Sequence, residues 1–207
     1  MTDDFLNYNK NGIGSQLILN KCYEGGKSVT EKKENPQKTL SKELLRQALL
    51  DLMKEKPYKQ ISITELTMQA DLARRTFYRH FITIDDVLDY HIQMICNEMV
   101  VMFLEEEKKD FQILVVLYFK FWEGYKEFLL ILKKNDLLFM LLQKTMAGIR
   151  QKLSEITNKT SCPISREYSF YFTAGGLWNL MVKWIEDGTK LSPEEMGYIS
   201  KNIMDNL

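Results

Sequence analysis

The chain has 207 residues, which suits one large domain or a small domain and a larger one. Since 45% of the residues are hydrophobic and 12% are aromatic, the chain can bury a substantial core. Gly (10) and Pro (4) are scarce, and this composition favours helices over sheets. The formal charge sums to zero. The three cysteines, Cys22, Cys96 and Cys162, have no metal-ligand or redox spacing, and an odd number fits no complete disulfide framework, so reduced thiols are indicated.

The first 36 residues are polar and rich in turn-forming residues, and they carry five basic and five acidic side chains. Such a composition does not support a packed core, so residues 1–36 are predicted to be a mobile arm. Asp3 and Asp4 are acidic and no early apolar run follows them, which is unlike a secretory signal peptide. We therefore expect a cytoplasmic protein.

Residues 37–83 have the pattern of three helices, of which the second and third are short. Apolar side chains recur at helical spacing over 40–53, and Pro57 ends this first helix. The second helix is predicted over 63 to about 70 and the third over 74 to about 80, with a three-residue corner between them.

Two capping motifs mark the starts of helices. Ser62 and Glu65 have the Ser-x-x-Glu spacing of a capping box, directly before the second helix. Thr83 and Asp86 repeat this spacing and begin a long fourth helix that continues through Met102.

From residue 111 onward one helical pattern follows another, separated by short charged or turn-like breaks. The most apolar window, 111–122, is too short to cross a bilayer and contains Lys120, so no membrane association is predicted. No strand-like alternation or internal repeat is present. The sequence predicts an all-α chain with about nine helices, the later ones near 111–123, 125–133, 135–157, 165–186 and 193–204.

Three strings in the second and third helices carry a family resemblance. They are Ile-Ser-Ile-Thr-Glu-Leu at 61–66, Ala-Asp-Leu-Ala at 70–73 and Thr-Phe-Tyr-Arg-His-Phe at 76–81. With them, residues 38 to about 88 resemble the tetracycline-repressor (TetR) family of bacterial transcriptional regulators. The resemblance covers about a quarter of the chain.

The resemblance implies a division into domains. Residues 37–83 would form a three-helix helix-turn-helix DNA-binding domain, in which the helix over 74–80 enters the major groove. Residues 84–207 would form a larger helical domain that binds an effector and pairs two subunits.

The sequence departs from the family pattern at three places. Asp71 stands at the corner where the family usually has Gly, and Asp tolerates the positive φ that this corner requires. Ala73 stands where a capping Ser or Thr is common, so the third helix is predicted to lack a side-chain cap. Ile84, followed by Asp85 and Asp86, replaces a Lys that would contact a phosphate.

The charge distribution points to the front of the chain as the part that meets a polyanion. Residues 37–80 hold nine Lys and Arg against five Asp and Glu, whereas residues 81–207 hold fourteen against eighteen. Arg75 and Arg79 lie one helical turn apart, and they are expected to reach guanine O6 and N7 or nearby phosphates; a solvated basic surface is the alternative. The predicted DNA contacts are Lys38, Thr64, Arg74, Arg75, Thr76, Tyr78, Arg79 and His80.

The rear of the chain is rich in aromatic and Met side chains. These side chains are explained by a large core, or by the effector pocket that the resemblance implies. The two explanations are compatible, since a pocket needs only a gap in a core. The pocket candidates are Tyr118, Trp122, Tyr125, Phe128, Met146 and Trp178.

The segment 168–185 is apolar nearly all round, so its helix must be buried on more than one side. We interpret it as half of a four-helix dimer interface, with the helix from Pro193 as the other half; burial within one subunit is the alternative. The predicted interface residues are Tyr171, Ala174, Gly175, Trp178, Met181 and Val182.

The predicted function is a sequence-specific, ligand-responsive repressor that acts as a homodimer on a palindromic operator in double-stranded DNA. The effector is an unknown small molecule, and no cofactor, metal or enzymatic activity is predicted. His91 and Cys96 are five residues apart and do not share a tight face, so they do not suggest a catalytic pair. The alternative function is a helical protein-interaction or architectural module that kept the fold without specific DNA reading, which Asp71, Ile84 and Asp85 would support.

Overall fold

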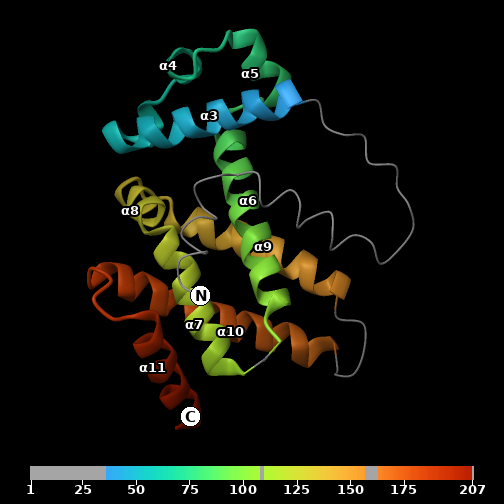
Figure 1. Cartoon of the computed structure of the whole chain (residues 1–207), viewed down its shortest axis with the longest axis vertical. Coiled ribbons are helices and arrows are strands. Elements are labelled where there is room, and N and C mark those ends of the chain that lie inside the picture. The colour runs from blue at the N-terminus through green and yellow to red at the C-terminus, as the bar shows by residue number, and fades with distance from the viewer. Residues whose placement is uncertain (1–35, 108–109, 157–162, 207) are drawn as a thin grey trace. The chain divides into compact units, whose positions relative to one another are not determined.

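A computed structural model describes residues 36–107, 110–156 and 163–206 (Figure 1). Within these ranges it contains nine α-helices and one short 3-10 helix, with no strand, which confirms the predicted all-α fold. The predicted arm lies outside the described residues except for Pro36. Cys22 and Cys162 lie outside them too.

The chain divides into two compact units between His91 and Ile92, inside helix α6 (Ile84–Glu105). Unit 1 ends at His91 and unit 2 begins at Ile92. The domain boundary expected from the sequence, between 83 and 84, coincides with the start of α6.

Unit 1 contains the three predicted helices and the first turns of α6. Helix α3 contacts both α4 and α5, which follow each other at the top of Figure 1. Phe77 and Leu66 are fully buried in the core that these helices share. The elements of unit 1 before α6 are α3 (Pro36–Glu55), the 3-10 helix η1 (Tyr58–Gln60), α4 (Ile63–Gln69) and α5 (Arg74–His80).

The predicted helix starts in unit 1 are confirmed by their hydrogen bonds. The Glu65 backbone N–H donates to Ser62 Oγ at 3.2 Å, and the Ser62 N–H donates to a Glu65 carboxylate oxygen at 3.0 Å, which is a complete capping box. Before α6, the Thr83 N–H donates to Asp86 at 2.7 Å and the Asp86 N–H donates to Thr83 Oγ1 at 3.3 Å. Both pairs satisfy backbone donors that a helix start leaves free.

Unit 2 consists of the rest of α6 and five further helices. Its buried core includes Trp122 and Phe119 on α7, Leu129 on α8 and Trp184 on α10. The helix boundaries agree with the prediction to within three residues. They are α7 (Phe111–Gly124), α8 (Lys126–Lys134), α9 (Leu138–Ile156), α10 (Pro163–Glu186) and α11 (Pro193–Asp205).

Helix α11 packs closely along α7. Gly197 makes this approach possible, because a Cβ atom at this position would lie 2.4 Å from Val116 Cγ2 and 3.2 Å from the Gln112 carbonyl oxygen. The helix begins with a second complete capping box, between Ser192 and Glu195.

Among the described residues, only α6 is long and apolar enough to cross a membrane by length and composition. This helix differs from the window 111–122 that the sequence singled out as most apolar. Core helices of soluble proteins have the same composition, and α6 carries fully buried side chains at Val87, Leu88 and Ile92. The composition of α6 alone therefore gives little support to a membrane segment.

Candidate nucleic-acid interface

The corner between α4 and α5 is a left-handed helix end. Asp71 has a φ of 51°, as the sequence predicted for this position. The Leu72 N–H donates to the Thr67 carbonyl at 2.9 Å, and the Asp71 N–H donates to the Met68 carbonyl at 3.1 Å. This pair of bonds is the Schellman motif, which usually takes Gly at the left-handed position. The corner therefore forms with Asp in place of Gly and turns the chain directly into α5.

Helix α5 begins without a side-chain cap, as predicted from Ala73. Its place in unit 1 depends on the buried ring of Phe77, which lies 6.1 Å from the ring of Phe81 and 5.3 Å from that of Tyr78. A seven-residue helix gains little stability from its own hydrogen bonds. Packing of these rings on the rest of unit 1 must hold α5 in place.

The spacing of an α-helix places Arg75 and Arg79 about 160° from Phe77 on either side, so these two residues form the outermost strip of α5. Both side chains are exposed, and neither makes an ion pair with another described residue. The two remaining strips flank this one. Arg74 and Tyr78 form one flank, in which Arg74 Nη2 lies 3.5 Å from Tyr78 Oη, and Tyr78 is 52% exposed.

Thr76 and His80 form the other flank and are less accessible, since both are half-buried. The Nε2 atom of His80 is shielded from solvent. The prediction that His80 lies on an outer face therefore holds only in part, because its ring packs near Phe81 with 6.4 Å between the ring centroids.

Lys38 and Thr64 lie outside α5. Both are exposed, Lys38 in the first turn of α3 and Thr64 near the start of α4. Close to Thr64, Lys56 forms an ion pair with Glu65. Hydrogen bonds from Lys56 and then Ser62 lower the pKa of Glu65 to about 2, so this carboxylate stays charged beside the α4 N-terminus.

The start of α6 offers no cation at the position where the sequence lacks the family Lys. Ile84 is half-buried there, and the neighbouring Ile82 is 80% exposed. Tyr58 donates a hydrogen bond to Asp85, and burial followed by this hydrogen bond raises the pKa of Tyr58. An open hollow of about 400 Å³ lies here, lined by Tyr58, Lys59, Ile61, Ile63, Ile82, Thr83, Ile84 and Asp85.

A polar network between α3 and α6 supports unit 1 behind this surface. Glu43 accepts hydrogen bonds from Arg46 Nε at 2.8 Å and from Tyr90 Oη at 2.9 Å. Arg46 Nη1 lies 3.5 Å from His91 Nδ1. Burial, and then the charge of Arg46, lower the pKa of His91 to about 3, so this buried imidazole is neutral at physiological pH.

His91 and Cys96 have no sign of catalytic activation. Burial raises the pKa of the Cys96 thiol, which disfavours the nucleophilic thiolate, and the depressed pKa of His91 makes it a weak base. Among the described residues, no group of three His, Cys, Asp or Glu side chains is arranged to hold a metal ion.

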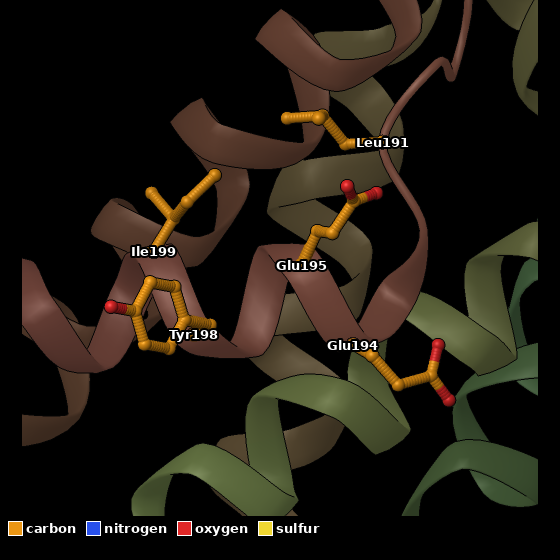
Figure 2. Close-up of a pocket in the computed structure, with 5 residues that line it drawn as sticks. All are labelled: Leu191, Glu194, Glu195, Tyr198 and Ile199. Carbon is orange, nitrogen blue, oxygen red and sulfur yellow. The ribbon is translucent and has the colours of Figure 1, made fainter.

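Three of the six predicted pocket residues pack against one another in unit 2, with ring centroids 6.3 Å apart for Tyr118 and Trp122 and 6.2 Å apart for Trp122 and Tyr125. Tyr118, Trp122 and Phe128 are buried, and Tyr118 Oη lies 3.5 Å from Met181 Sδ. Tyr125, Met146 and Trp178 are half-buried. An open hollow in unit 2 lies elsewhere, on α11 and the loop before it. Its volume is about 410 Å³. Figure 2 shows the residues that line it, which are Leu191, Glu194, Glu195, Tyr198 and Ile199.

The predicted dimer residues differ in accessibility. Met181 is fully buried within unit 2, so it has no surface to offer a second subunit. Ala174, Gly175, Trp178 and Val182 are half-buried, and Tyr171 is 43% exposed. Nothing lies within 4 Å of a Cβ atom built on Gly175.

The more exposed apolar stripe of α10 lies nearer its N-terminus and was missed by the sequence analysis. It consists of Ile164, Tyr168 and Phe172, which are 66%, 73% and 65% exposed. Their four-residue spacing places them on one side of the helix. This spacing was visible in the sequence, but an exposed stripe cannot be told from a buried one by spacing alone.

Comparisons with known proteins point to a transcriptional regulator. Residues 110–206 match a family described as "Transcriptional regulator C-terminal region". Over 76 residues the chain is 32% identical to the uncharacterized HTH-type transcriptional regulator YxbF of Bacillus subtilis (strain 168); the match covers 36% of this chain but only 20% of that protein. The chain thus matches about a fifth of the length of this curated relative.

A solved structure resembles the chain in fold. It is described as the dihydroxyacetone kinase operon activator DhaS, and it aligns with a TM-score of 0.50 over 80% of this chain and 94% of its own. Since the identity is 16%, this likeness concerns the fold alone.

Proposed function

Because the comparisons support a TetR-family transcriptional regulator, we propose that this chain binds double-stranded DNA sequence-specifically through α5. The observation that carries the proposal is the outermost strip of this helix, where Arg75 and Arg79 point away from the buried Phe77. An exposed basic helix on a small rigid core has the dimensions to enter the major groove. Phosphate contacts from Lys38 and Thr64 would position the unit without reading sequence.

We further propose that two copies pair, so that two recognition helices enter successive major grooves of a palindromic operator, about 34–36 Å apart. The exposed stripe Ile164, Tyr168 and Phe172 on α10 supports pairing, since monomeric proteins rarely leave aromatic side chains of this size together in water. The proposed setting is the cytoplasm.

A small molecule bound in unit 2 would regulate DNA binding, and the proposed action is repression. Such an effector must prefer one conformation energetically, because equal affinity for two conformations shifts no equilibrium. The aromatic and Met side chains around Tyr118 and Trp122 supply the apolar surroundings that such a ligand needs.

The test is binding to the promoter region of the chain's own gene, measured by fluorescence anisotropy with a random duplex as competitor. Arg75→Ala with Arg79→Ala should abolish the preference for the promoter. Lys59→Ala is the matched control, since it removes a positive charge from an exposed position of unit 1 outside α5. Retention of the preference in the double variant would contradict the proposal.

The alternative, an interaction module without specific DNA reading, is favoured by the start of α6. Ile82, Ile84 and Asp85 line an open hollow at a place where a phosphate contact was expected. A salt titration separates the two functions. Sequence-specific DNA binding that weakens steeply with salt supports the regulator, and no binding even at low salt supports the module.

A further inference from the structure

We infer that each half-site of the operator presents two guanines within three consecutive base pairs, one read by Arg75 and the other by Arg79. This inference rests on the proposed function, because it assumes that α5 enters the major groove. It goes further by assigning base contacts to the outermost strip of α5 and phosphate contacts to the flank of Arg74 and Tyr78, and by specifying what the bases must be.

Arg75 and Arg79 are the two arginines of α5 that remain available for bases. They lie opposite the buried Phe77, and neither makes a hydrogen bond or ion pair with another described residue. Arg74 lies on the flank instead, with its Nη2 atom 3.5 Å from Tyr78 Oη. A flanking pair of this kind faces the wall of the groove, where the phosphates are, while the outermost strip faces the base edges on the groove floor.

The chemistry of the guanidinium group selects the base. It is planar, carries five N–H donors and has no acceptor. In the major groove only guanine presents two acceptors side by side, N7 and O6. Adenine pairs an acceptor with a donor and cytosine presents a donor, so neither satisfies both arms of an arginine fork. Each of the two arginines therefore favours guanine.

The spacing of the two arginines sets the spacing of the guanines. Four residues along a helix correspond to about 6 Å, and the whole of α5, with seven residues, is only about 10 Å long. In zinc fingers, helix residues three apart contact successive bases. Residues four apart on a helix this short therefore reach adjacent or next-but-one base pairs, which is a window of three.

The experiment begins with selection of duplexes from a random library by the full chain, at a fixed salt concentration. Guanines of the selected half-site are then replaced one at a time by 7-deazaguanine, which removes the N7 acceptor and leaves the base pair intact. We expect two sensitive guanines within three base pairs, each with an affinity loss of about 5- to 150-fold. Elsewhere in the half-site the replacement should have little effect.

Arginine variants assign each guanine to its reader. In Arg75→Ala one of the two positions should become insensitive to 7-deazaguanine, and in Arg79→Ala the other. Arg75→Lys keeps the charge but loses the planar fork, so it should keep non-specific affinity and lose discrimination. Because both side chains are exposed, these variants should retain the helical circular dichroism of the parent.

The outcomes separate this inference from the proposed function. If selection yields no preferred sequence, the proposed function fails. If it yields a preferred sequence whose guanines all tolerate 7-deazaguanine, or whose sensitivity persists in both alanine variants, the chain reads DNA by another strip and the guanine assignment is wrong.

Discussion

The close contact between α7 and α11 gives a sharp prediction for Gly197→Ala. The added methyl group would lie 2.4 Å from Val116 Cγ2 and 3.2 Å from the Gln112 carbonyl oxygen. Val116 is β-branched and short, and Gln112 contributes backbone, so neither neighbour can move away without shifting a helix. Overpacking of this kind costs about 1–3 kcal/mol. Against this cost, Ala is more favourable than Gly inside a helix by about 1 kcal/mol.

The difference between these two terms is about 0–2 kcal/mol, and we expect Gly197→Ala to lower the free energy of unfolding by an amount in this range. The measurement is urea denaturation followed by circular dichroism, at one fixed protein concentration because pairing of subunits would add to stability. The matched control is Gly148→Ala on α9, where the new Cβ would lie 3.6 Å from Cys96 Cβ, an ordinary contact distance. This control should be neutral or more stable by about 0.5–1 kcal/mol.

A double-mutant cycle tests the assigned cause. Val116→Ala removes the methyl group that the new Cβ would meet, so Gly197→Ala should be less destabilising in this background than in the parent. A coupling energy of about 1 kcal/mol or more is expected for two side chains in direct contact. If Gly197→Ala proves more stable than the parent, or if the two substitutions are additive, α11 does not approach α7 as closely as described.

Three further substitutions test unit 1. Asp71→Gly should stabilise the chain by about 0.5–1 kcal/mol, because Gly accepts the φ of 51° more readily; a less stable variant in urea denaturation would argue against a left-handed corner. Ala73→Ser should add a cap to α5 worth about 0.5–2 kcal/mol, visible as a higher melting temperature unless the N-terminus of α5 is already satisfied. The pKa of His91 is about 3 in the folded chain, whereas the ordinary value is 6.5. As pH falls below 6.5, His91 therefore takes up a proton in the unfolded chain but not in the folded chain. Stability should therefore decrease below about pH 6.5, by up to about 1.4 kcal/mol per pH unit, and His91→Gln should flatten this dependence.

Most helix starts could be predicted from the sequence, because the residues of a capping motif lie close together along the chain. Ser62 with Glu65, and Ser192 before Pro193, both form the expected hydrogen bonds. Helix ends were harder to locate when the left-handed residue was not Gly. Asp136 has a φ of 58° and ends α8, so α9 begins at Leu138 and not at 135 as predicted.

The candidate interface could be predicted only as far as one helix determines it. The four-residue spacing of Phe77 and Phe81 establishes which side of α5 is inward, and from this the exposure of Arg75 and Arg79 follows. The partial burial of His80 depends on its packing beside Phe81, which no spacing rule describes. Likewise, the complete burial of Met181 depends on neighbours from other helices.

The shortness of α5 has a consequence for genetics. A seven-residue helix without a cap keeps its shape only while the rings beneath it are well packed. A screen for cells that have lost regulation should therefore return two classes of substitution in unit 1, one at the arginines and one at Phe77 or Leu66. The second class would be temperature-sensitive and would regain activity on cooling, whereas the first would stay inactive at every temperature.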